Sequence, residues 1–93
     1  MPVSDQQVNY FVEDLLKYVP DKNSPDVTLH AFQTIEHSDN FGPRHAVLRK
    51  ADPGVNARIA QTIKKLLGRE NDEEISVSRS ECSLIKSYTR FKP

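Results

Sequence analysis

The fold class depends on the stretch Val27-Thr28-Leu29-His30-Ala31-Phe32-Gln33-Thr34-Ile35-Glu36. Apolar residues alternate with polar ones through most of it, as in a β-strand that has one solvated face. Phe32 and Gln33 break the alternation, because the ring falls on the polar side and the amide on the apolar side. We interpret the break as a bulge, or as a Phe32 side chain covered by a neighbouring element or a partner. The stretch is therefore predicted to be a strand.

Further strands are expected on its C-terminal side. A turn cluster at residues 39–43 precedes a short strand at 45–49, His-Ala-Val-Leu-Arg, which would pair with the first in antiparallel fashion. Residues 75–78 alternate again, and a last strand would run from Cys82 to about Tyr88. The alternative is one long strand through Tyr88, and the sequence does not decide between the two.

An amphipathic helix is predicted on the N-terminal side. The Ser4 hydroxyl and the Gln7 side chain form a capping box, the usual start of a helix. Apolar residues then recur at helical spacing until Pro20 stops the helix. The residues expected on the buried face are Val8, Phe11, Val12, Leu15, Leu16 and Val19.

A second amphipathic helix follows the 45–49 strand. Asp52 is its expected N-cap, Pro53 its first residue and Gly68 its C-terminal cap. Its apolar stripe consists of Val55, Ile59, Ile63, Leu66 and Leu67. The predicted order is thus α-β-β-α-β-β, an α+β fold whose two helices pack on one face of a mainly antiparallel sheet.

Size and composition favour one folded domain over residues 1–93. The chain has 93 residues, of which 37% are hydrophobic and 28% charged, as in ordinary globular proteins. So small a domain hides only about two-thirds of the surface of its unfolded chain, so we expect a second copy to cover an apolar face. The lone Cys82 indicates a reducing compartment, and no apolar run is long enough to cross a bilayer. The prediction is a cytoplasmic homodimer without membrane contact.

Motifs of catalysis are missing from the sequence. The three histidines, His30, His37 and His45, do not have the spacing of metal ligands on a helix. There is no nucleophile elbow, no Cys/His motif and no glycine-rich phosphate loop. We expect a protein that is not an enzyme and that uses no catalytic residue, metal or cofactor.

Binding to another protein is the preferred interpretation. Phe32 and Phe41 stand outside the apolar pattern, and the C-terminal end carries Tyr88, Arg90 and Phe91. Aromatic residues and arginine are the usual anchors of protein interfaces, although Tyr88 and Phe91 would alternatively cap the core. Residues 1–42 and 43–93 carry about −5 and +5, a split that favours oriented association. We expect a small adaptor, inhibitor or regulator.

Nucleic-acid binding is the alternative function. Basic residues gather in the predicted second strand and second helix, and Arg58, Lys65 and Arg69 share one face of that helix. Such a row can follow a phosphate backbone, or it can be the solvated side of an amphipathic helix. The candidate residues for nucleic-acid contact are Arg44, His45, Arg49, Lys50, Arg58, Lys65 and Arg69.

A short motif adds to this alternative. Gly42-Pro43-Arg44-His45, between two predicted strands, resembles the loop between the first two strands of double-stranded RNA-binding domains. The resemblance implies that this loop enters the minor groove of duplex RNA. It covers about a third of the chain. Pro53-Gly54-Val55-Asn56 stands where that family has a lysine cluster, a third strand is missing before the last helix, and the C-terminal strands have no counterpart.

Overall fold

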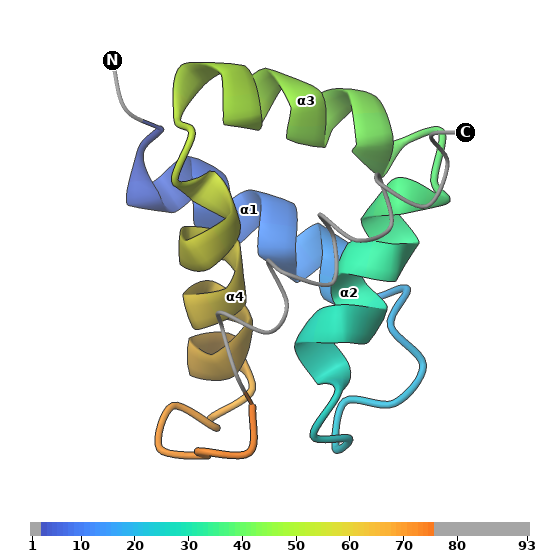
Figure 1. Ribbon diagram of the computed structural model, residues 1–93, viewed down its shortest axis with the longest axis vertical. Coiled ribbons are helices and arrows are strands. Elements are labelled where there is room, and N and C mark those ends of the chain that lie inside the picture. Colours follow the sequence, from blue (N-terminus) through green and yellow to red (C-terminus); the bar gives the residue numbers. More distant parts are fainter. Residues whose placement is uncertain (1–2, 76–93) are drawn as a thin grey trace, which may run out of the picture.

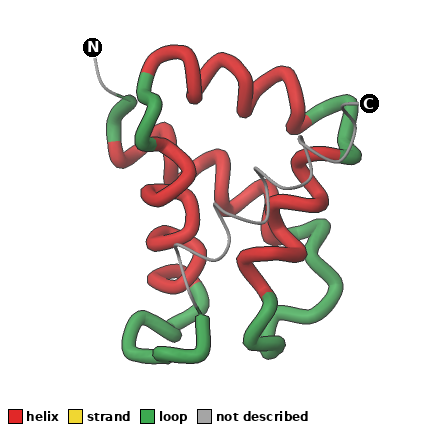
Figure 2. Tube along the Cα trace, viewed as in Figure 1, coloured by secondary structure: helices red, strands yellow, loops and turns green. Residues whose placement is uncertain are grey.

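The computed structural model describes residues 3–75, and over these residues the chain forms four α-helices and no strand. Their bounds are Asp5–Leu16 for α1, Val27–Glu36 for α2, Phe41–Ala51 for α3 and Val55–Leu66 for α4 (Figure 1). Figure 2 shows only helices and loops along the described trace. The predicted α+β fold is therefore wrong. The described residues form a small all-helical globule, in which α2 and α3 occupy the positions of the first two expected strands.

The four helices enclose one core. α1 packs against α4 and α2, and α3 packs against the same two helices from the other side. In Figure 1, α3 lies across the top of the molecule, above α1, with α4 and α2 descending on either side. The buried apolar residues come from every helix and from the segments beside them: Val3, Val8, Phe11, Val12, Leu15, Leu16, Val19, Val27, Ala31, Phe32, Ile35, Phe41, Val55, Ile59, Ala60, Ile63 and Ile75.

Residues 27–36 form α2 because their apolar spacing suits a helix better than a strand. Val27, Ala31 and Ile35 recur every four residues, which fits both a period of two and a period of 3.6. Phe32 distinguishes the two patterns, because only a helix brings it to the same face as Ala31 and Ile35. The Phe32 side chain is 1% exposed. The irregularity interpreted as a bulge is thus the signature of the helix.

Residues 39–43 and 45–49, predicted as turn and strand, belong largely to α3. The Ser38 hydroxyl accepts from the amide of Phe41 at 3.0 Å and so caps the start of the helix. Pro43 lies in the first turn, where a missing N–H leaves no intrahelical hydrogen bond unmade. Phe41 and His45 are buried and Leu48 is half-buried, at positions i, i+4 and i+7. The helical period therefore replaces the strand period here as well.

The two predicted helices are present. The capping box between Ser4 and Gln7 opens α1, and the whole predicted apolar stripe of α1 faces the core. Of the stripe predicted for the second helix, Val55, Ile59 and Ile63 are buried, Leu67 is half-buried, and Leu66 is 38% exposed. Gly68 has φ +68°, the left-handed conformation expected of a C-terminal cap. α4 begins at Val55 and not directly after Asp52, because residues 52–54 make a turn in which the Asp52 carboxylate accepts from the Gly54 amide at 3.0 Å.

The strands expected at 75–78 and 82–88 lie outside the described residues apart from Ile75. Ile75 is buried at 2% exposure, and its carbonyl accepts from the Lys64 ammonium at 3.2 Å. Among the helices of residues 3–75, none has the length and apolar character required to cross a membrane.

Candidate functional site

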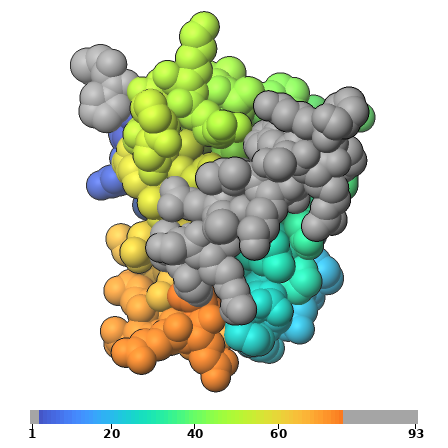
Figure 3. Space-filling view, viewed as in Figure 1, coloured from blue at the N-terminus to red at the C-terminus, as the bar shows by residue number. Residues whose placement is uncertain are grey.

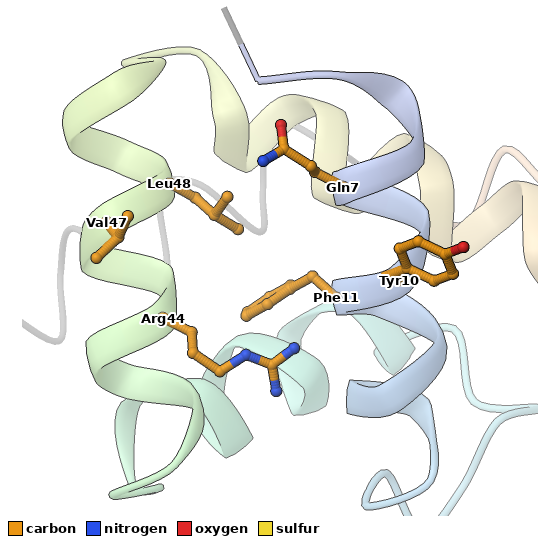
Figure 4. A pocket seen from close by; sticks show the side chains of 6 residues that line it. All are labelled: Gln7, Tyr10, Phe11, Arg44, Val47 and Leu48. Carbon is orange, nitrogen blue, oxygen red and sulfur yellow. The ribbon is translucent and has the colours of Figure 1, made fainter.

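An open groove lies between α1 and α3 and has a volume of about 320 Å³. Its α1 side consists of Gln7, Tyr10 and Phe11, and its α3 side of Arg44, Val47 and Leu48. Figure 4 shows Phe11, Arg44 and Leu48 projecting into the space between the helices, with Tyr10 and Val47 at its two edges. The groove is mostly apolar and combines an aromatic floor with a single cation.

The two edge residues are unusually exposed for their type. The side chains of Tyr10 and Val47 are 61% and 68% exposed. The Tyr10 hydroxyl accepts from the Gln6 amide at 3.1 Å, which orients the phenol along α1. Exposed apolar side chains on both sides of a hollow are typical of a surface that another molecule covers.

Arg44 connects the two sides of the groove. Its guanidinium bonds the Asp14 carboxylate at 2.8 Å and lies 5.3 Å from the ring centroids of both Phe11 and Phe41. The two rings meet edge to face, with centroids 5.8 Å apart. Arg44 thereby spans α1 and α3 by an ion pair and two cation–π contacts, and the groove is a preformed feature of the fold.

His45 lies beneath the groove, buried at 3% exposure. Its ring stacks on Phe11 with centroids 6.3 Å apart, and its Nε2 donates to the Asn56 amide oxygen at 2.7 Å. Burial lowers the pKa of His45, the nearby charge of Arg49 lowers it further, and the bond to Asn56 opposes both. At neutral pH the imidazole is therefore uncharged, and it links α3 to α4.

The aromatic residues expected to anchor a partner are not at this surface. Phe32 and Phe41 are 1% and 2% exposed and belong to the core. Both residues stood outside the apolar pattern only because strands were assumed. With the helical period of α2 and α3, Phe32 and Phe41 lie on the buried faces. Tyr88, Arg90 and Phe91 lie outside the described residues.

The residues expected to contact nucleic acid are dispersed and partly engaged within the fold. Arg58 donates to Asp52 at 2.8 Å and to Asp5 at 2.7 Å, and these two bonds raise the pKa of Arg58. The bond from Arg58, together with that from the Gly54 amide, lowers the pKa of Asp52. Arg69 follows the end of α4 and donates to the carbonyls of Lys22 and Ser24. It also donates to the Asp72 carboxylate, and this bond lowers the pKa of Asp72.

The other candidates are divided between two helices. Arg44 and His45 serve the α1–α3 packing described above. Arg49 and Lys50 are exposed near the end of α3, and Lys65 is exposed on α4. The structure does not bring the expected row of Arg58, Lys65 and Arg69 together as one free face. The resemblance to double-stranded RNA-binding domains also fails, because residues 42–45 lie in the first turns of a helix and not in a loop between strands.

Sequence reasoning missed Tyr10 and Val47. Tyr10 lies off the apolar stripe of a helix that was predicted in full, so its exposure followed from the helical period. Val47 could not be found, because within a predicted strand its side-chain direction was undetermined.

Comparison with known proteins gives no relative for this arrangement. No protein-family model matches the chain, and neither the curated proteins nor the solved structures contain a significant match. Within residues 3–75 there is no group of three or more His, Cys, Asp or Glu side chains placed to hold a metal ion.

Proposed function

We propose that this protein is a non-enzymatic protein–protein interaction module, an adaptor or regulator, that self-associates through the groove between α1 and α3. The observation that carries the proposal is the pair of exposed apolar side chains, Tyr10 and Val47, on the two edges of one preformed apolar groove. The lone cysteine, Cys82, favours a reducing compartment, and we place the protein in the cytoplasm.

A second copy of the chain is the occupant that the charges favour. α1 contains three acids and no base, whereas α3 contains three bases and no acid. Asp14 pairs with Arg44 and Asp5 with Arg58 inside one copy, so Glu13 of α1 and Lys50 of α3 are the exposed charges considered for a partner. A two-fold axis through the groove places α1 of one copy against α3 of the other, so that unlike charges meet twice in one symmetric interface.

Two exposed side chains would form the charged rim of this interface. Glu13 follows Tyr10 by three residues on α1, and Lys50 follows Val47 by three residues on α3, so each charge lies beside an apolar edge residue. In the two-fold arrangement Tyr10 and Val47 form the apolar centre, and Glu13 of each copy faces Lys50 of the other. Such a pattern of apolar centre and charged rim is usual in protein interfaces.

Light scattering on the chromatographically separated chain tests the proposal. The wild-type protein is expected to be a dimer, and Val47→Glu is expected to raise the dimer dissociation constant about tenfold or more, because it buries a charge at an apolar contact. Tyr10→Ala should act in the same direction. The matched control is Tyr18→Ala, since Tyr18 is also 61% exposed but lines another hollow of the surface.

Charge reversal tests the geometry of the dimer. Glu13→Lys and Lys50→Glu should each weaken it, and the double variant should restore it because the pair is inverted and not lost. A monomeric wild-type protein at all concentrations would overturn the proposal. Equal loss of the dimer in Tyr18→Ala and Tyr10→Ala would overturn the assignment to this groove.

A further inference from the structure

The helices α3 and α4 have the connection of a helix-turn-helix unit. α3 ends at Ala51 and α4 begins at Val55, so three residues, Asp52-Pro53-Gly54, join them. Figure 1 shows the two helices crossing at a wide angle, and Figure 3 shows their surfaces adjoining at the upper left of the molecule. Two helices joined at a wide angle by a three-residue turn with glycine are the form in which many proteins present a helix to the major groove of DNA.

The crossing is held from inside and outside. On the inside, the buried His45 of α3 bonds the half-buried Asn56 of α4 at 2.7 Å. On the outside, Asp52 in the turn accepts from the Gly54 amide at 3.0 Å and from Arg58 at 2.8 Å. A fixed crossing is what this unit needs, because the first helix sets the angle at which the second enters a groove.

The exposed face of α4 carries side chains suited to reading bases. Val55, Ile59, Ala60 and Ile63 face the core. On the opposite face Ala57, Gln61 and Lys65 follow one another at intervals of four residues, with Gln61 and Lys65 exposed. Gln can bond adenine through two atoms, Ala can contact the thymine methyl, and Lys can bond guanine or phosphate.

The charge of the unit is complementary to DNA. Residues 41–66 contain six bases and one acid, Asp52, which is already bonded to Arg58. Arg44 is paired with Asp14 of α1 at 2.8 Å, so one of the six bases is also compensated within the fold.

Two more carboxylates border the exposed row: Asp5, bonded to Arg58 at 2.7 Å, and Glu70 beyond the C-terminal end of α4. Glu70 lines one hollow with Gln61 and Lys65, so the C-terminal end of the row lies beside a carboxylate. The contact is therefore expected mainly through the first two turns of α4, whose counterparts in the second helix of such units usually meet the bases.

We infer that α3 and α4 form a helix-turn-helix unit that binds duplex DNA, with Ala57 and Gln61 directed at base edges and Lys65 at the far end of the contact. This function is distinct from self-association through the α1–α3 groove, because the row lies on α4 outside the groove residues.

Selection from a duplex DNA pool with a randomised centre tests the inference. The full chain is incubated with the pool at about 50 mM salt, and retained duplexes are sequenced over successive rounds. We expect one sequence to be enriched. Gln61→Ala should bind that sequence about tenfold more weakly and the unselected pool as tightly as before. Lys65→Ala should weaken both and reduce the slope of log affinity against log salt by about one.

Two variants elsewhere on the surface provide matched controls. Gln33 on α2 and Lys17 after α1 are exposed, so Gln33→Ala and Lys17→Ala change the same residue types away from α4. Both should bind as the wild type does. No enriched sequence would overturn the inference, and so would an equal loss in Gln33→Ala and Gln61→Ala. Displacement of the selected duplex by single-stranded DNA or duplex RNA at equal concentration would overturn it as well. A monomer that selects a duplex sequence would overturn only the proposed self-association.

Discussion

The buried imidazole of His45 makes the stability of the helical globule depend on pH. Burial lowers its pKa in the folded chain below the ordinary value of 6.5. As the pH falls through that value, the unfolded chain binds a proton at this position that the folded chain does not, so the free energy of unfolding decreases. The free energy of unfolding stops decreasing once the pH is below the pKa that His45 has in the folded chain. Urea unfolding between about pH 8 and pH 5 measures this effect.

The variant His45→Gln separates this effect from that of other groups. The glutamine amide keeps a donor for the Asn56 oxygen but has no proton to gain. Its free energy of unfolding should therefore depend less on pH below 6.5 than that of the wild type. Identical profiles for the two proteins would show that His45 is not the group responsible.

Some single side chains were predictable and others were not. The Ser4–Gln7 capping box depends on residues three apart, so local sequence suffices to find it. The roles of Arg58 and Arg69 depend on partners up to 55 residues away, among them Asp5 and Lys22. The sequence does not show these distant partners, so both arginines were predicted to be available for a ligand. In the structure they donate to carboxylates and carbonyls of other segments.

At the scale of elements, α2 differs from the sequence prediction for a reason that mutation can test. Phe32 was expected as a surface anchor and is instead 1% exposed in the core. Phe32→Ala should reduce the free energy of unfolding by about 3–5 kcal/mol, because it leaves a cavity among well-packed residues. Chemical denaturation measures the loss. Gln33→Ala, at an exposed neighbour, should change stability by less than about 0.5 kcal/mol. Similar values for the two variants would contradict the helical assignment.

Arg69 connects the α1–α2 loop to the segment after α4. Arg69 donates to the carbonyls of Lys22 and Ser24, 47 and 45 residues earlier in the chain, and to Asp72. Arg69→Ala should therefore lower the free energy of unfolding by about 1–3 kcal/mol, with amide exchange accelerated in both segments. The control is Lys65→Ala, since Lys65 is an exposed base four residues before Arg69. This variant should leave amide exchange in the α1–α2 loop unchanged.

At the scale of the whole molecule, the charge split was visible in the sequence but its placement was not. The split between the negative and positive halves was expected to favour oriented association, without a particular surface assigned to either half. In the structure the acidic α1 and the basic α3 border one groove, and Arg44 and Asp14 already meet across it at 2.8 Å. Only the packing order of the helices decides this, and the period of the apolar residues does not specify which helices become neighbours.

The two proposals together predict the symmetry of the DNA sequence that the protein selects. A two-fold dimer carries two α4 helices, and such a pair binds two half-sites in inverted orientation, about 34 Å apart for adjacent turns. The wild-type protein should therefore enrich an inverted repeat. Val47→Glu lies outside α4 and should weaken the proposed dimer, so below the dissociation constant of the variant dimer it should enrich one half-site and bind the full repeat more weakly. Sequencing of the two selected pools measures this difference directly. The contrary outcome is a dimeric wild type that enriches only single half-sites. The two α4 helices would then not face one duplex, and the two-fold axis of the dimer could not run through the α1–α3 groove.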